Sequence, residues 1–546
     1  MLLGVVVSYA SRTRVEPVAT PSVPERGRAI VEEVNWTLAD AWELEEFEPP
    51  AVADDLTILR RLSLALHGTI PSLEEIRQFE ADTEPDRLTR WTRRLLDDPR
   101  FGNYFAERLA RPLVGADAGP FILFRRDRFT AWLAERLMTD EPWDATVRHL
   151  IADEGLWTDT PSVNFVTMQF TNDEKAVDAS RLTARTVRAF LGQRIDCAQC
   201  HDHPFEQWKQ SQFEGLAAHY AQPSIGIGGM KDNPETSYVL QDAETLEDRT
   251  IDPALPFGDE WLVSTAALTN EDVETMRPRR QLALWVTSEE NHRFDRAIVN
   301  RVWTLMMGRP VVPSRPVDDL PDPVDPIDRA FGDEHDEWAV LDLLADDFRS
   351  SGRHLHRLIE TIAASEAFRA TSQSDHIGSQ RDRAEDVWAV RPLVRLRPEQ
   401  MIGSMLQAGS IRTIDRDSHL AVRFLRLVRE NDFVRDYGDA GEAELDDRSA
   451  TIPQALLRMN GKLADELSEA SPMTAAGRLA MVESDPTRFV ETAYLICLTR
   501  RPTDAEREYF VGELTTAAEE GPEAREQAVQ DVFWTLFNSP EFSWVR

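Results

Sequence analysis

Apolar residues recur at helical spacing along most of this chain, and that pattern limits its fold more than any other feature of the sequence. The stretch LTILRRLSLALHG places four leucines on one stripe of a helix, namely Leu56, Leu59, Leu62 and Leu66. Residues 128–155 and 180–194 repeat the same spacing. The pattern predicts a mainly α protein.

One internal region and the N-terminal end depart from the helical pattern. Residues 222–262 contain Gly, Pro and short β-prone runs, which indicate strands and turns. Residues 11–50 are rich in Pro and Glu and have little periodicity, so we expect a flexible lead-in there. The sequence therefore predicts two large helical domains with a small strand-containing insertion between them. The expected limits are 1–53 for a signal or lead-in, 54–221 for the first helical domain, 222–262 for the insertion and 263–546 for the second helical domain.

A helix–turn–helix pattern appears near both ends of the chain. ALHGTIPSLEEIRQF and CLTRRPTDAEREYF each contain a turn, a proline and a capping box, formed by Ser72 with Glu75 and by Thr503 with Glu506. Three later turns, LLDDPRF, IAASEAF and LFNSPEF, each end in phenylalanine. We interpret these features as a recurring unit whose terminal phenylalanine fills the core. The alternative is a coincidence of common helix-capping signals.

Charge and hydropathy argue against nucleic acid binding and against membrane-spanning segments. Lys and Arg number 61 against 96 Asp and Glu, which gives a net charge of −35 and repels phosphate backbones. We therefore expect no nucleic acid partner. No segment approaches the eighteen apolar residues of a membrane-spanning helix. We therefore expect that the chain is not an integral membrane protein, apart from a candidate N-terminal signal. The apolar start MLLGVVVSYA resembles part of such a signal and favours a periplasmic or secreted location, with the cytoplasm as the alternative.

The segment DCAQCHDHPFEQW carries the strongest chemical signal. Two of the three cysteines, Cys197 and Cys200, lie here and are followed at once by His201. On one helical turn both thiols point the same way and can bind the two vinyl groups of a porphyrin, while the imidazole faces the iron. This spacing predicts haem c. The sixth iron ligand stays open among Met168, His219 and Met230.

The same segment also suits zinc or another transition metal. Cys197 and Cys200 would supply thiolates, and His201 or His203 would supply nitrogen. Structural zinc usually joins separated segments, so this alternative needs a further ligand from elsewhere. The additional candidates are His219 and His292 as distant ligands, and Asp202 as a ligand or as a residue that orients one. Spacing favours haem over zinc, and two small buried cysteines are the third interpretation.

An acidic loop follows the next helical stretch. Asp318, Asp319, Asp322 and Asp325 could surround a calcium ion, but the glycine-centred spacing of an EF-hand is missing. A solvated acidic loop is therefore favoured. We expect Arg301 to be a structural anchor that pairs with an aspartate of this loop.

Several longer motifs resemble a known pair of domains. FLGQRIDCAQCHDHPFEQWKQSQFEGLAAHY closely resembles the planctomycete-type cytochrome-like domain, whose hallmark is CAQCHDHPF, and LRRLSLALHGTIPSLEEIRQF resembles its opening. NHRFDRAIVNRVWTLMMGRPVV and IPQALLRMNG are similar to the domain that follows it in those proteins. Together these motifs cover most of residues 54–546.

The resemblance implies little about function. Both domains are of unknown function, the cytochrome name rests largely on CxxCH, and the proteins are regarded as exported. Relatives often carry an additional cytochrome c domain, whereas this chain contains no second CxxCH. The acidic loop before Trp338 also departs from the family's usual Asn-Pro-Pro-Ser-His-Pro run.

Three functions remain open from the sequence, and it does not decide whether the protein is an enzyme. The first is an extracytoplasmic haem c protein with an electron-transfer or redox role and a redox partner protein. The second is a zinc or other metal-binding protein with a structural or hydrolytic site. The third is a non-catalytic helical scaffold that binds a partner. An apolar slot beside His201 favours the first, a closed cluster of ligands the second, and no cavity near Cys197 the third.

Overall fold

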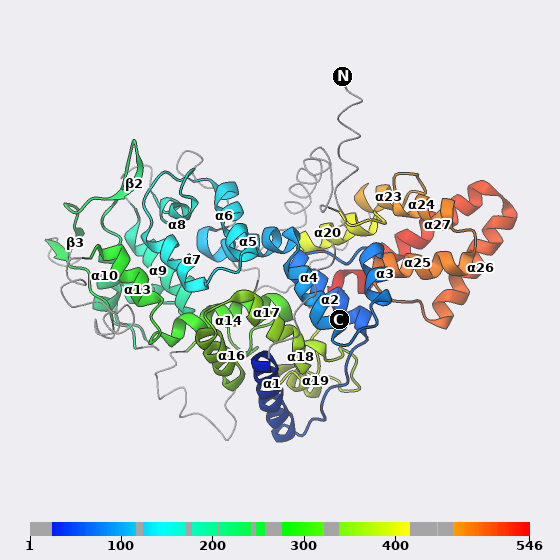
Figure 1. The fold of residues 1–546 in the computed structure, drawn as a ribbon, viewed down its shortest axis with the longest axis horizontal. Coiled ribbons are helices and arrows are strands. Elements are labelled where there is room, and N and C mark those ends of the chain that lie inside the picture. Colours follow the sequence, from blue (N-terminus) through cyan, green and yellow to red (C-terminus); the bar gives the residue numbers. More distant parts are fainter. Residues whose placement is uncertain are drawn as a thin grey trace.

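The structure is a computed structural model, and it is mainly helical (Figure 1). It describes residues 25–115, 124–170, 177–204, 207–241, 247–256, 276–321, 338–414, 445 and 462–545. The helices that precede the strand-containing region are α1 (Glu25–Leu44), α2 (Asp55–His67), α3 (Leu73–Ala81), α4 (Arg87–Leu96), α5 (Pro99–Val114), α6 (Arg126–Met138), α7 (Trp143–Ala152), η1 (Pro161–Val163), α8 (Asn164–Thr167), α9 (Ala179–Leu191), η2 (Asp196–Gln199) and α10 (Gln210–Ala218).

Two antiparallel hairpins follow α10 and confirm the expected strand-containing insertion. Their strands are β1 (Pro223–Gly226) with β2 (Gly229–Asp232), and β3 (Tyr238–Gln241) with β4 (Asp248–Ile251). The first hairpin is attached to the helical body because Met230 and Gly155 exchange two backbone hydrogen bonds of 2.9 Å. A side chain at Gly229 would lie 2.2 Å from the carbonyl oxygen of Gly155, so only glycine permits this close approach.

Helices then continue to the C-terminal end, where a third small sheet forms. The elements are α13 (Pro278–Val286), α14 (His292–Met307), α16 (Ala339–Ser350), α17 (Leu355–Ala364), α18 (Glu366–Arg369), α19 (Ser379–Asp386), β5 (Val394–Arg395), α20 (Pro398–Ala408), α23 (Lys462–Ser468), α24 (Ala475–Val482), α25 (Pro486–Leu498), α26 (Asp504–Glu520), α27 (Pro522–Asn538), η4 (Pro540–Ser543) and β6 (Trp544–Val545). Strand β6 pairs with β5 in antiparallel register, with Val394 opposite Val545.

Two hydrophobic clusters make up most of the core. The first extends from α1 to residue 390 and includes α14, in which every residue from Arg293 to Met307 is buried. The second contains side chains of α20 and α23–α27 together with Leu64 of α2. Helix α2 contributes to both clusters, so it lies where the two parts of the molecule meet. The first cluster joins side chains from both sides of the strand-containing insertion, and the expected domain limits stay predictions.

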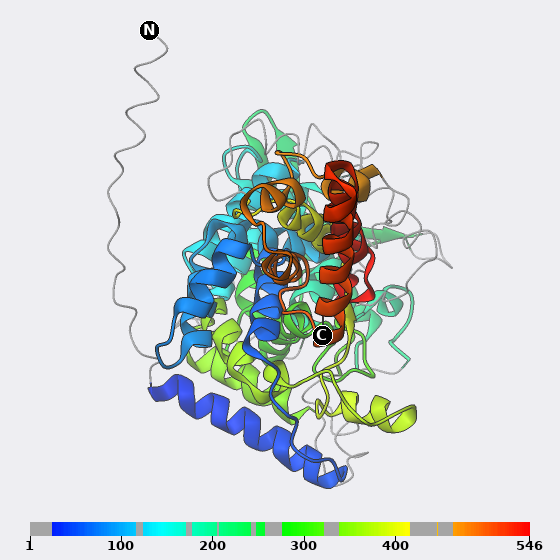
Figure 2. The ribbon, with the colours of Figure 1, turned by 90° about the vertical axis from the view of Figure 1, so that its right-hand side faces the viewer.

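The expectation of a flexible lead-in up to residue 53 is wrong for residues 25–44, which form α1. Figure 2 shows this helix lying along one edge of the molecule. Its side chains Val34, Leu38 and Trp42 recur every four residues and are buried against α16 and α17. The Trp42 indole N–H also donates to the carbonyl of Val387 at 2.8 Å. Residues 1–24 lie outside the described residues.

The recurring helical unit is present at both ends of the described chain. We call residues 54–101 the first unit and residues 485–542 the second unit. Both expected capping boxes form, at Ser72 with Glu75 and at Thr503 with Glu506. The three phenylalanines that end the turns, Phe101, Phe368 and Phe542, are each 0% exposed. These side chains therefore fill the core as the pattern predicts.

Within the part of the chain that the structure describes, no helix combines the length and the apolar character needed to cross a bilayer.

Candidate functional site

The CxxCH segment begins where a glycine stops α9. Gly192 adopts a left-handed conformation, with φ 65° and ψ 30°, directly after Leu191. The chain then leaves the helix direction and forms the short 3₁₀ turn η2. The motif is thus held between α9 and α10 on a tight turn.

The turn separates buried from exposed side chains. Side chains three residues apart lie above one another in a 3₁₀ helix. Ile195 and Ala198, which are three apart, are both 0% exposed and fix the turn to the core. Cys197 and Cys200, also three apart, are free and exposed. Cys197 within the turn and Cys200 at its C-cap are therefore both accessible from solvent.

His201 follows on the same exposed surface, and a hydrogen bond defines its tautomer. Its Nδ1 lies 2.7 Å from the carbonyl oxygen of Asp202. A carbonyl oxygen can only accept, so Nδ1 carries the proton and donates it. In the neutral imidazole the second ring nitrogen, Nε2, is then the one that can bind a metal.

The neighbours of His201 shape the loop that leads into α10. The Asp202 carboxylate accepts the backbone N–H of Gln210 at 2.9 Å, and the backbone N–H of His203 donates to Trp208 at 2.8 Å. The Trp208 indole is buried and donates to the side chain of Gln193 at 3.2 Å. Asp202 thus orients His201 through its backbone carbonyl, while its carboxylate caps a helix.

His203 is less exposed than His201 and is engaged with the base of the loop. Its ring is hydrogen-bonded to the backbone of Arg194. Burial lowers the pKa of His203 and the neighbouring His201 acts in the same direction, whereas the Asp319 carboxylate opposes them. His203 therefore contributes to loop structure in the observed arrangement.

A buried aspartate holds the chain just before the motif. Asp318 accepts from Arg194 Nη2 at 2.7 Å and from Arg188, and its side chain is 4% exposed. Burial acts to raise its pKa, but the arginine charges prevail and hold it below the usual value. The backbone N–H of Leu320 donates to Gly192 at 2.7 Å. These contacts form a clamp between the segment after α14 and the base of the CxxCH turn.

The clamp corrects one expectation about the acidic loop. Asp318 is buried and ion-paired, so the favoured solvated loop is wrong at this position because two arginines of the α9 region reach it. Arg301 is a buried anchor as expected, and its Nη1 donates to the carbonyl of Ala189 at 2.9 Å. It also lowers the pKa of Asp318 through its charge. Asp322 and Asp325 lie outside the described residues.

A hollow borders the turn on the side of α9. It has a volume of about 390 Å³, and Asp196 and Gln199 of η2 form part of its wall. Three arginines at helical spacing on α9 also line it: Arg181, Arg185 and Arg188. The lining is polar, so this hollow is not the apolar slot beside His201 that would favour the haem function.

The other expected ligands lie in different surroundings. Met230 and His219 are 0% exposed. His219 Nδ1 donates to the carbonyl of Gly215 at 2.9 Å, and burial lowers the pKa of His219 to about 4.

Met168 is partly buried against the first hydrophobic cluster. His292 lies at the start of α14 and accepts from Arg349 at 2.7 Å. His219 and His292 thus use ring nitrogens in other hydrogen bonds, and among the described residues no metal-binding group joins either of them to the thiols.

The zinc alternative requires a closed group of ligands. Among the described residues, no three His, Cys, Asp or Glu side chains gather where they could hold a metal ion. The arrangement in hand is instead an open one, with Cys197, Cys200 and His201 all facing solvent.

Sequence reasoning missed the residues of the clamp. Arg188 and Arg194 are ordinary arginines in the sequence, and only the acidic run at 318–325 hinted at a partner. Their pairing with Asp318 spans 124 to 130 positions, which no local pattern reveals.

The fold and the turn define a mainly helical protein that presents one CxxCH motif on its surface. Residues 33–224 match PSCyt2, a protein family of unknown function (DUF1549), and residues 278–419 match PSD1, a protein family of unknown function (DUF1553). The chain therefore contains a PSCyt2 domain followed by a PSD1 domain, as the resemblance predicts. No curated protein and no solved structure matches. The CxxCH motif lies in the first match and Asp318 in the second, so the clamp joins the two domains.

Proposed function

We propose that this chain is a c-type haem protein in which Cys197 and Cys200 hold the cofactor and His201 binds the iron. The observation that carries the proposal is that Cys197 in η2 and Cys200 at its C-cap are both free and exposed and are followed at once by an imidazole whose Nδ1 donates to Asp202. The cytochrome-like name of the PSCyt2 family adds support.

The side chains at the motif fit this cofactor. Both thiols are free and exposed, so neither a disulfide nor core packing has to be broken before thioether bonds form. The third cysteine, Cys497, is 0% exposed, and burial raises the pKa of its thiol. Cys497 is therefore unsuited to the same role.

The protein's own residues would fix the position of the cofactor. The Asp202 carbonyl orients the imidazole of His201, and the clamp through Asp318 fixes the base of the turn. A bound haem c supplies one-electron transfer. Because the motif lies at the surface, a redox partner protein can approach it directly. Covalent haem attachment normally takes place outside the cytoplasm, so we infer a periplasmic or secreted location.

The test is to produce the chain together with a c-type haem maturation system and to analyse the purified protein. We expect a Soret band and haem that stays on the polypeptide under denaturing conditions, with about one haem per chain. The paired substitution Cys197→Ala and Cys200→Ala should abolish covalent haem. His201→Ala should keep some covalent haem but change the visible spectrum, since the iron loses an axial ligand.

Cys497→Ala is the matched control, because it removes a cysteine that the proposal does not use. Its haem content should equal that of the unchanged protein. A matured protein without haem would contradict the proposal. In that case, stoichiometric zinc that is lost with Cys197 and Cys200 would favour a metal site, and the absence of both cofactors would favour a scaffold.

A further inference from the structure

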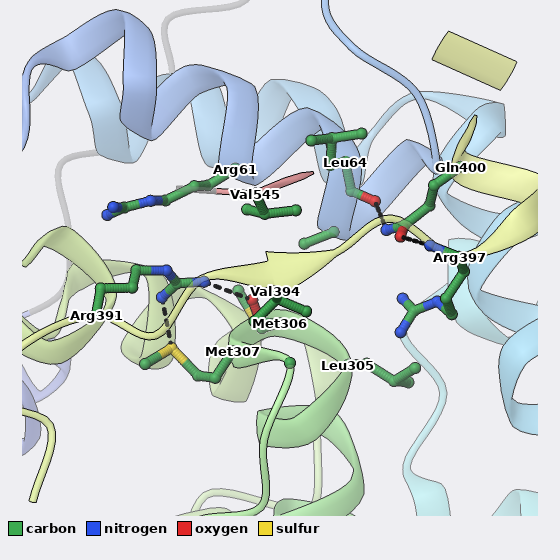
Figure 3. Close-up of a pocket in the computed structure, with 12 residues that line it drawn as sticks. Arg61, Leu64, Leu305, Met306, Met307, Arg391, Val394, Arg397, Gln400 and Val545 are labelled. Carbon is green, nitrogen blue, oxygen red and sulfur yellow. Dashed lines mark hydrogen bonds between the residues drawn. The ribbon is translucent and has the colours of Figure 1, made fainter. Parts of the chain in front are cut away.

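A second cavity lies far from the CxxCH turn, where the two hydrophobic clusters meet. It has a volume of about 20 Å³, and its lining comes from α2, the end of α14, β5, α20 and β6 (Figure 3). Three arginines, Arg61, Arg391 and Arg397, line it, whereas none of its described lining residues is Asp or Glu. The cavity is therefore positively charged although the whole chain carries −35.

Arg391 is the residue that makes this lining unusual. It is 1% exposed, and its guanidinium donates to the carbonyl of Met306 at 3.0 Å and to the sulfur of Met307 at 3.0 Å. It also lies over the ring of Phe368, 4.7 Å from the centroid. All these partners are uncharged, and the buried Nε of Arg391 has no hydrogen-bond partner among the described residues.

Two other buried arginines of this protein have carboxylate partners. Arg279 pairs with Asp232 at 2.7 Å, and Arg353 pairs with Asp295 at 2.8 Å. Burying a guanidinium without a counter-charge costs several kcal/mol as an order of magnitude. Consistent with this cost, burial alone lowers the pKa of Arg391 to about 9. No carboxylate among the described residues pairs with Arg391.

We propose that this cavity binds a small monatomic anion, such as chloride, against the guanidinium of Arg391. A volume of about 20 Å³ admits one water-sized particle and excludes acetate, phosphate or larger anions. In Figure 3 the guanidinium of Arg391 extends toward the middle of the view, opposite Arg397. An anion there accepts from the unpartnered Nε–H and also neutralises the charge, whereas a water molecule would do only the first.

The anion would stabilise the junction between the domains. Leu64 of α2, Met306 of α14, Val394 of β5 and Val545 of β6 all border the cavity. A ligand that binds only the folded chain stabilises that chain. The stabilisation grows with the logarithm of the ratio of the ligand concentration to the dissociation constant, once the concentration exceeds this constant. Anion binding therefore couples halide concentration to the stability of this junction.

The test compares thermal unfolding in sodium chloride and in sodium gluconate at equal concentration. Chloride should raise the unfolding midpoint by about 2 °C over gluconate, which is too large for the cavity. Arg391→Met removes the charge and should abolish the difference. Arg500→Met is the control, because Arg500 already pairs with Glu506 and Glu541 and lies elsewhere, so the difference should persist.

Crystals soaked in sodium bromide provide a second measurement that needs no variant. An anomalous peak within hydrogen-bond distance of Arg391 Nε supports the site even if Arg391→Met fails to fold. Equal midpoints of the unchanged protein in chloride and gluconate would overturn the proposal. A water molecule without anomalous signal at this position would do so as well.

Discussion

The first unit and the second unit have the same turns but differ in where they bury their charges. Each begins with an aspartate cap, Asp54 or Asp485, and the first helix of each ends at a left-handed residue. Each continues through a capping box and ends in a buried phenylalanine. In each unit the glutamate of the capping box belongs to an ion cluster, and the two units differ in the composition and burial of this cluster.

In the first unit the arginine comes from the final turn. Arg100 lies between Glu75 and Asp98, and all three side chains are at most 9% exposed. In the second unit Glu541 takes the place of Arg100 in the final turn, and Arg500 comes from the earlier turn instead. Arg500 binds Glu506 and Glu541 at 2.8 Å each, and its side chain is 17% exposed.

The position of each unit explains the difference in burial. Helix α2 of the first unit lies where the two hydrophobic clusters meet, and its Arg60 donates to the carbonyl of Cys497 in the second unit at 3.1 Å. The second unit lies at one end of the molecule (Figure 1), and α26 buries only Leu514 and Ala517. The same sequence of turns thus carries a buried ion cluster in the middle of the molecule and a partly exposed one at its end.

The largest expected effect is the loss of the buried arginine. Arg100→Ala leaves the carboxylates of Glu75 and Asp98 buried without a partner and should lower the free energy of unfolding by about 3–5 kcal/mol. Arg500→Ala should cost about 1 kcal/mol or less, since its partners are a third exposed. Thermal unfolding of the two variants, measured side by side, checks the comparison. Equal losses would show that burial does not separate the two clusters.

The second prediction concerns pH and the first unit. Burial and then the Arg100 charge lower the pKa of His67 to about 4, from an ordinary value of 6.5. Between pH 6.5 and 4 the unfolded chain therefore binds more protons than the folded one, and stability falls as the pH drops. The loss for one such histidine is on the order of 3 kcal/mol across this range.

Unfolding midpoints measured from pH 7 to pH 4 test this expectation. His67→Gln should flatten part of the decline. His219, whose pKa burial lowers to about 4, should maintain the rest together with His203 and His292, whose pKa values burial also lowers. The second unit has no buried histidine, and its Glu506 pKa of about 2 makes it acid-sensitive only below pH 4.5. An unchanged slope in His67→Gln would show that His67 is not the titrating group.

The smallest predicted effect is a difference in stability between substitutions at the two left-handed helix ends. Gly68 has φ 69°, and a side chain there would lie 2.3 Å from the ring of Tyr104, so Gly68→Ala should cost about 2 kcal/mol. Thr499 occupies the matching position with φ 55°, and Thr499→Gly relieves this backbone strain while losing a hydroxyl. We expect a change within about 1 kcal/mol for Thr499→Gly. Chemical denaturation of both variants measures the contrast, which equal losses would refute.

The sequence alone determined the local features of this protein. The two capping boxes and the CxxCH turn follow from residues three positions apart, and the strand-containing insertion follows from a local run of Gly, Pro and β-prone residues. Such contacts depend on the geometry of a single helix or turn, so their residue spacing is sufficient to predict them.

Only the tertiary structure decided the long-range partners. Asp318 pairs with Arg188 and Arg194, Val394 of β5 lies opposite Val545 of β6, and α1 packs onto α16 although its region looked flexible. The positive cavity at Arg391 likewise exists only where separate helices and strands meet. These contacts depend on how helices pack, because many surfaces of similar apolar pattern compete and shape complementarity selects among them.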